Sequence, residues 1–236
     1  MHYGIIAAGE GSRLVREGVA LPKPLVDLDG RPMIERLIDI FVSLGAESVG
    51  IIVNEQMTAV RQYLEELKGR LSVPLTLVVR TTPSSMHSFY ELSRLMRGRG
   101  RFILTTVDTI FRREDFARYV EAYTAAPPQV DGMMAMTTYI DDEKPLYIDV
   151  DADMRITAFR DAPTGADRYI SGGIYGLSER AIDVLEKCLA DGVSRMRNYQ
   201  RALVSAGLDI RGYDLGKIID VDHAADIDTA KRFIGA

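Results

Sequence analysis

The stretch "AAGEGSRLVREGVALPKPLVDLDGRPMIERLID", from Ala7 to Asp39, decides the fold. An apolar run over residues 2–8 leads into it and predicts a strand. Apolar residues at helical spacing, closed by a glycine, predict a helix over residues 32–45. The turn between them carries two glycines, which let the backbone approach a phosphate closely. The stretch therefore predicts an α/β fold with a phosphate site after its first strand.

Apolar runs alternate with helical patterns through the first half of the chain. The expected elements are strands over residues 2–8, 48–54, 75–80 and 101–108, and helices over residues 32–45, 56–70, 88–98 and 113–126. Strands that alternate with helices form βαβ units and a mostly parallel sheet. Ligands of such sheets lie beyond the carboxyl ends of the strands, which is where the glycine turn falls.

The second half of the chain changes character, because several strands follow one another without intervening helices. Strands are expected over residues 132–140, 146–153, 155–161, 168–178, 208–215 and 217–222, and helices over residues 179–192, 195–207 and 224–236. A turn is expected over residues 151–155, and the proline-containing stretch 124–132 is interpreted as a loop. We predict one domain over residues 1–236, a Rossmann-like mixed, mostly parallel sheet flanked by helices, with a small antiparallel portion.

Composition narrows the class of function. The formal net charge is -5 and the pI is about 5.3, whereas a nucleic-acid-binding protein usually has a basic excess, so no nucleic-acid partner is expected. The only cysteine, Cys188, excludes an internal disulfide and a cysteine zinc site. No apolar stretch approaches the roughly 20 residues of a membrane span, and the start lacks a signal-peptide pattern. A cytoplasmic protein without a membrane partner is expected.

Two common phosphate-binding motifs do not fit the glycine turn. A dinucleotide fingerprint needs a third glycine where Leu14 stands, and an acidic residue at the end of the second strand, where the sequence has Asn54. A Walker-type loop needs a lysine where Glu10 stands.

The whole stretch fits a third pattern better. Gly9-x-Gly11-x-Arg13, followed ten residues later by Lys23-Pro24, resembles the signature of the sugar-nucleotidyltransferase family, the nucleoside-diphosphate-sugar pyrophosphorylases. The resemblance continues through residues 25–39. It implies an enzyme that joins a nucleoside triphosphate to a phosphate monoester and releases pyrophosphate. Because the monoester is already a nucleophile, catalysis would consist of positioning and charge neutralisation.

The resemblance also implies roles for individual residues around the triphosphate. Arg13 would hold the leaving pyrophosphate, and Lys23 would hold the α-phosphate or the incoming monoester, so both are catalytic candidates. The implied nucleotide-binding residues are Ala7, Ala8, Gly9, Gly11, Ser12, Ser84 and Ser85. The sequence departs from the family at residues 16–18, where Arg-Glu-Gly replaces a frequent Pro-Leu-Thr.

A divalent cation, Mg²⁺, is the implied cofactor, because polyphosphate transfer needs one. Asp108, after the fourth strand, would be one ligand. Asp222, in the turn before the last helix, would be the second, with Asp220 left open as its rival.

The implied acceptor-binding residues are Asp161, Ser171 and Gly172. Glycines within the expected strand 168–178 also predict a bulge or a close ligand. Arg195, Arg197 and Arg201 could bind a phosphate, but a solvated helix face is the preferred interpretation.

The expected partners are therefore an NTP and a small phosphorylated acceptor, either a sugar 1-phosphate or a related phosphoalcohol. A CTP-dependent cytidylyltransferase for a phosphocholine-like acceptor is an alternative. A glycosyltransferase of related fold is a second alternative, but it would carry Asp-x-Asp after the fourth strand, where the sequence reads Val107-Asp108-Thr109.

Overall fold

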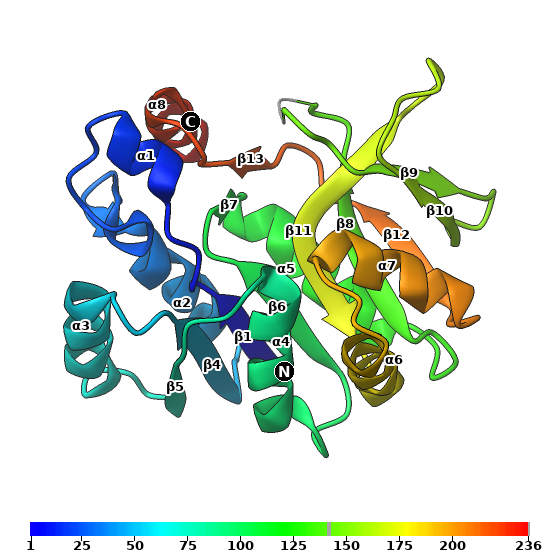
Figure 1. Ribbon diagram of the computed structural model, residues 1–236, viewed down its shortest axis with the longest axis horizontal. Helices are drawn as coiled ribbons and strands as arrows, with labels where there is room; N and C mark the ends of the chain where they lie inside the picture. The colour runs from blue at the N-terminus through cyan, green and yellow to red at the C-terminus, as the bar shows by residue number, and fades with distance from the viewer. Residues whose placement is uncertain (141–142, 236) are drawn as a thin grey trace.

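A mixed β-sheet crosses the middle of the molecule between two layers of helices (Figure 1). The computed structural model describes residues 1–140 and 143–235. The strands are β1 (His2–Ile6), β2 (Asp27–Leu28), β3 (Arg31–Pro32), β4 (Ser48–Val53), β5 (Leu75–Val79), β6 (Phe102–Thr106), β7 (Thr109–Ile110), β8 (Gly132–Thr137), β9 (Tyr147–Val150), β10 (Ile156–Arg160), β11 (Tyr169–Leu177), β12 (Ile210–Asp214) and β13 (Ile219–Asp220).

The helices lie mainly between strands of the first half and at the end of the second half. They are α1 (Ser12–Arg16), the 3-10 helix η1 (Lys23–Leu25), α2 (Met33–Ser43), α3 (Thr58–Lys68), α4 (Ser85–Met96), α5 (Arg113–Ala125), α6 (Glu179–Ala190), α7 (Met196–Ser205) and α8 (Ala224–Ile234). No described helix combines the length and the apolarity that a bilayer crossing needs.

The sheet confirms the predicted fold class. Its strands run in the order β10-β9-β11-β6-β1-β4-β5, and β8 joins β11 to β12 on a branch. The strands β6, β1, β4 and β5 are parallel, as the βαβ pattern predicts. The long strand β11 runs antiparallel to β6, β8 and β9, and β10 runs antiparallel to β9. These antiparallel strands are the portion that the second half of the sequence predicts.

Both faces of β1 and β4 are buried, so both strands are largely apolar. Side chains alternate between the two faces of β1. Tyr3 and Ile5 pack in the layer of α2, α3 and α5, where the Tyr3 ring stacks on Phe41 with 4.1 Å between centroids. Ile6 packs in the opposite layer, with α4, α6 and α7. A smaller hydrophobic cluster contains Leu14 of α1 and Ala230 of α8, so it packs the first part of the chain against the last helix.

The short elements are the ones that the sequence did not predict. These are α1, η1, β2, β3 and β7, each of five residues or fewer, in which hydrophobic periodicity has too few positions to be visible. Helix α4 begins at Ser85 rather than at residue 88, and the last expected strand shrinks to β13. Residue 236 of the last expected helix lies outside the described residues.

The glycines of β11 form the predicted bulge. The pairing of β11 with β8 shifts register between Ser171 and Tyr175, and Gly173 has a φ of 71°. A Cβ at Gly173 would stand 2.5 Å from Oγ1 of Thr109. This close approach matters for the site, because Thr109 lies next to Asp108, one of the predicted metal ligands.

Replacing Gly173 with alanine should therefore destabilise the protein. The left-handed backbone and the clash with Thr109 lead us to expect a loss of about 1–3 kcal/mol in the free energy of unfolding, measured by urea denaturation. Gly69→Ala is the matched control, because Gly69 has a φ of -68° and room for a Cβ. An equal loss in both variants would contradict this account.

Candidate active site

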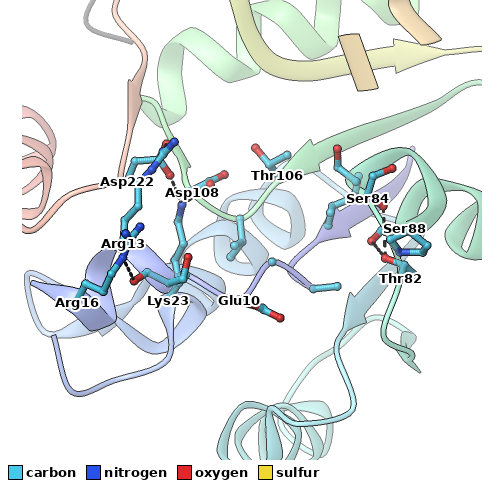
Figure 2. A pocket seen from close by; sticks show the side chains of 18 residues that line it. Glu10, Arg13, Arg16, Lys23, Thr82, Ser84, Ser88, Thr106, Asp108 and Asp222 are labelled. Carbon is cyan, nitrogen blue, oxygen red and sulfur yellow. Dashed lines mark hydrogen bonds and ion pairs between the residues drawn. The ribbon is translucent and has the colours of Figure 1, made fainter. Parts of the chain in front are cut away.

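A cavity of about 680 Å³ opens at the carboxyl edge of the parallel strands. Its wall is formed by the turn after β1, the turn after β6 and the start of α4. Its lining residues are Ile6, Ala8, Gly9, Glu10, Gly11, Ser12, Arg13, Arg16, Lys23, Thr82, Pro83, Ser84, Ser85, Ser88, Thr106, Val107, Asp108 and Asp222. Figure 2 shows Arg13, Arg16, Lys23, Asp108 and Asp222 at one end of this cavity and Thr82, Ser84 and Ser88 at the other, with Glu10 between them. We call it the first cavity.

The glycine turn packs directly on the lysine of the signature. Gly11 has a φ of 61°, and a Cβ there would stand 3.0 Å from Cβ of Lys23. A side chain at position 11 would therefore push Lys23 out of place. Ala7 is buried below the turn and donates its backbone N–H to Ile52, so it does not line the cavity.

Lys23 lies between the two predicted metal ligands. Its Nζ is 2.5 Å from Oδ2 of Asp108 and 2.7 Å from Oδ1 of Asp222. The lysine side chain is only 9% exposed. Burial alone lowers the pKa of Lys23, but the two carboxylates outweigh it and raise that pKa above its usual range. Burial likewise favours a neutral Asp108, yet Lys23 holds the pKa of this carboxyl below its usual value. Lys23 and Asp108 are therefore both charged at neutral pH.

Arg13 joins the same cluster from helix α1. Its Nη1 is 2.6 Å from Oδ2 of Asp222, and its Nη2 is 3.8 Å from Oε2 of Glu143. The Arg13 side chain is 41% exposed, so one side of the guanidinium faces solvent. Two cations and two carboxylates thus meet within a few ångströms, although they come from segments up to 209 residues apart.

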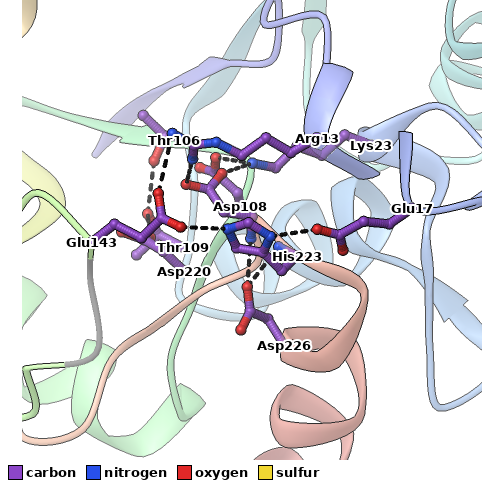
Figure 3. Close-up of polar contacts among 11 residues, drawn as sticks. Arg13, Glu17, Lys23, Thr106, Asp108, Thr109, Glu143, Asp220, His223 and Asp226 are labelled. Atoms are coloured by element: carbon purple, nitrogen blue, oxygen red, sulfur yellow. Dashed lines mark hydrogen bonds and ion pairs between the residues drawn. The ribbon is translucent and has the colours of Figure 1, made fainter. Parts of the chain in front are cut away.

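Asp220 and Asp222 take different positions around the cluster, and Figure 3 shows Asp220 beside Thr109. Asp222 lies beyond the end of β13 and contacts Lys23 and Arg13. Asp220 is the last residue of β13 and accepts a hydrogen bond from Oγ1 of Thr109 at 3.3 Å. Of the two, only Asp222 lines the first cavity, which is the position that the resemblance favours for the second metal ligand.

Two carboxylates suit Mg²⁺ better than a metal that needs a cage of protein ligands. Among the described residues no group of three or more His, Cys, Asp or Glu side chains could hold an ion. Mg²⁺ is commonly bound by one or two carboxylates together with water and substrate phosphates. Asp108 and Asp222 fit that donor set, because both carboxylates reach one point, the Nζ of Lys23.

The far end of the first cavity carries small hydroxyl groups. Ser84 and Ser85 line it, as the resemblance implies. The Ser84 hydroxyl lies 2.9 Å from Nδ1 of His87 and does not cap helix α4 through a backbone N–H. Oγ1 of Thr82 contacts Oγ of Ser88 at 2.6 Å. The sequence did not single out Thr82 and Ser88.

A second cavity of about 290 Å³ adjoins the first and shares Ser85, Thr106, Asp108 and Asp222 with it. The rest of its wall consists of Lys144, Leu146, Ser171, Gly173, Tyr175, Arg195, Met196, Arg197, Gln200 and Asp220. Ser171, a predicted acceptor-binding residue, is therefore in this wall, and its hydroxyl contacts Gln200 at 3.2 Å.

The other two predicted acceptor-binding residues lie outside this wall. A Cβ at Gly172 would meet Ile218 and the backbone of Ala135, so that residue faces the packed sheet. Asp161 forms ion pairs with Arg197, at 2.5 Å, and with Arg201, at 2.7 Å. Asp161 thus contacts the cavity only through Arg197.

The arginines at the start of α7 differ from the expectation of a solvated helix face. Arg195 and Arg197 line the second cavity, and Arg197 also donates a hydrogen bond to the carbonyl of Lys144. Arg195 has a φ of 73°, a backbone conformation that is strained for a bulky side chain. Strained residues of this kind cluster at functional sites. Helical periodicity could not place Arg195 in the cavity wall, because this residue precedes the helix and its direction depends on the unusual backbone.

The chain spans about half the length of the curated relatives that it matches. Mannose-1-phosphate guanylyltransferase 1 of Arabidopsis thaliana is 24% identical over 187 residues, which cover 77% of this chain and 51% of the relative. The UTP–glucose-1-phosphate uridylyltransferase AglF of Haloferax volcanii is 31% identical over 117 residues, or 49% of this chain and 41% of the relative.

The fold is shared with solved structures over the whole chain. The inositol-1-phosphate CTP transferase from T. maritima superimposes with a TM-score of 0.79 at 18% identity, over 100% of this chain and 98% of the other. The family model described as the MobA-like NTP transferase domain matches residues 4–165, which include the glycine turn, Lys23 and Asp108. The chain therefore belongs to the family of MobA-like NTP transferase domains.

Proposed function

We propose that the chain is a metal-dependent nucleotidyltransferase, which couples an NTP to a sugar 1-phosphate or a related phosphate monoester and releases pyrophosphate. The observation that carries the proposal is the convergence of Arg13, Lys23, Asp108 and Asp222 at the junction of the two cavities. One cavity can take the nucleotide and the other the acceptor. The proposal includes a single domain and a cytoplasmic location.

The reaction needs no side-chain nucleophile or base. An oxygen of the monoester attacks the α-phosphorus in line, the new P–O bond forms, and the bond from the α-phosphorus to the bridging oxygen of pyrophosphate breaks. The attacking oxygen already carries negative charge, so no proton has to be removed. The work left for the protein is to position the two phosphates and to neutralise their charge.

The residues of the first cavity supply that neutralisation. Arg13 presents a planar fork that matches the oxygens of the leaving pyrophosphate, and Lys23 presents a point charge to the α-phosphate. Asp108 and Asp222 would hold Mg²⁺, which supplies charge neutralisation between the phosphates when it is bound. Gly9, Gly11 and Ser12 line the same cavity and would donate backbone N–H groups to the triphosphate, and Ala8, Ser84 and Ser85 would contact the nucleoside.

The chemistry of the second cavity favours a sugar or polyol phosphate over a phosphocholine-like acceptor. Lys144, Arg195 and Arg197 give its wall three cations that suit a phosphate, and Asp108, Asp220 and Asp222 give it three carboxylates. Recognition of such an ammonium uses aromatic cages, and Tyr175 is the one aromatic residue among the described residues of this wall. Ser171, Gln200 and Asp220 offer hydrogen-bonding groups of the kind that hydroxyls need.

A substrate panel tests the proposal directly. The protein is incubated with Mg²⁺, each of the common NTPs in turn, and glucose 1-phosphate, mannose 1-phosphate, inositol 1-phosphate or phosphocholine, and released pyrophosphate is measured. We expect release with at least one sugar or polyol phosphate and none after addition of EDTA. Absence of release with every pair would refute the enzyme proposal, and release of nucleoside diphosphate from a nucleotide sugar would favour the glycosyltransferase alternative.

The role of Arg13 can be tested by its removal. Arg13→Ala should lower kcat by about 10²–10³-fold, the usual effect of losing one transition-state donor. Its circular dichroism spectrum should match that of the wild type, because the side chain is half exposed. Arg118→Ala, which removes an exposed arginine of α5, is the control and should retain full activity. An active Arg13→Ala variant would refute the assigned role.

A further inference from the structure

At the C-terminal end of helix α1, the side chains of Arg16 and Glu17 point in different directions. Both residues belong to the segment in which the sequence departs from the sugar-nucleotidyltransferase pattern. Arg16 lines the first cavity beside Arg13, whereas Glu17 does not line it. Glu17 follows Arg13 by four residues, so the two side chains lie on the same side of the helix, which faces the turn before α8.

Glu17 contacts the turn that carries Asp222 (Figure 3). Its Oε1 lies 2.6 Å from Nδ1 of His223, and its Oε2 accepts a hydrogen bond of 2.6 Å from the backbone N–H of Ala224. His223 and Ala224 directly follow Asp222, and Ala224 is the first residue of α8. A carboxylate is favoured at this end of a helix because the free N–H groups carry partial positive charge.

The same turn is also held from within its own helix. Oδ2 of Asp226 accepts hydrogen bonds from the backbone N–H groups of Asp222, at 2.9 Å, and His223, at 2.7 Å. Three consecutive N–H groups, those of residues 222–224, are therefore each bound by a carboxylate. Asp226 fixes the shape of the turn, and Glu17 fixes where that turn lies relative to α1.

The contact between Arg13 and Asp222 is the other polar tie between α1 and this turn, and the proposed reaction would break it. Arg13 would pass to the pyrophosphate and the Asp222 carboxylate to the metal. The contacts of Glu17 are outside the first cavity and can persist through that exchange. The apolar cluster around Leu14 and Val221 also persists, but such packing has little directional specificity.

We propose that Glu17 is a positioning residue, which holds the turn of Asp222 against α1 so that this carboxylate stays in place for the metal when Arg13 moves to the substrate. The inference rests on the proposed function. It assigns a role to a position at which this chain differs from the family pattern. Residues that orient metal ligands commonly change metal affinity about 10–100-fold when they are removed.

The test measures Mn²⁺ binding to the full-length protein by electron paramagnetic resonance, with Mn²⁺ alone as the probe. Glu17→Ala should weaken binding at least about tenfold, and it should raise by a similar factor the Mg²⁺ concentration for half-maximal pyrophosphate release. Glu17→Gln retains an oxygen for the Ala224 N–H and should stay within about threefold of the wild type. The urea midpoint of unfolding should change little in either variant, because the apolar cluster is intact.

Two further variants distinguish a failure of the positioning role from a failure of the proposed function. Asp222→Asn should abolish Mn²⁺ binding, and Glu65→Ala, which removes an exposed carboxylate of α3, should leave it unchanged. If Asp222→Asn loses binding and Glu17→Ala does not, the positioning role is wrong and the proposed function stands. A wild-type protein that binds no Mn²⁺ and releases no pyrophosphate would overturn both. A parallel fall of affinity and unfolding midpoint in Glu17→Ala would show a merely structural role and would also overturn the inference.

Discussion

The ion pairs of Lys23 with Asp108 and Asp222 are the constraint on which the rest of the site depends. A buried charge costs several kcal/mol unless partners compensate it, and losing one partner of such a group typically costs about 3–5 kcal/mol. Burial of charged Lys23 therefore depends on these two carboxylates or, in the proposed reaction, on the phosphate oxygens that would replace them. This requirement joins three distant parts of the chain, namely the signature loop, the turn after β6 and the turn before α8. The mixed sheet and the Leu14 cluster bring these segments together.

The fold could be predicted where the sequence repeats a pattern over many residues. The helices α2, α3, α5 and α6 and the strands of the parallel sheet follow the apolar periodicity closely. The short elements α1 and η1 could not be predicted in this way, because they owe their conformation to tertiary contacts. Helix α1 begins after Gly11, which has a left-handed backbone and leaves no room for a side chain beside Lys23.

The residues of the site can likewise be divided into those that a sequence pattern identifies and those that it does not. Residues that belong to a spaced motif, such as Arg13 and Lys23, could be singled out from the sequence, and the structure brings them together with Asp108 and Asp222. Their chemical roles stay predictions. The residues that sequence reasoning missed, Thr82 and Lys144 among them, carry no motif and lie in loops. Asp161 is the opposite case, because the sequence singled it out as an acceptor-binding residue. In the structure it lies near the second cavity, but its carboxylate is paired with two arginines.

The charge balance of the cluster also explains how an acidic protein could bind a polyphosphate and why a metal would be needed. At physiological ionic strength charges farther than about 8 Å are largely screened, so the net charge of -5 matters less than the groups in the cavities. Without a metal, Asp108 and Asp222 occupy Lys23 and Arg13 and would repel phosphate oxygens. In the proposed reaction Asp108 and Asp222 would hold the divalent cation, which would leave Lys23 and Arg13 for the substrate. Removal of the metal would then deprive the triphosphate of three positive partners, namely the metal ion itself, Lys23 and Arg13.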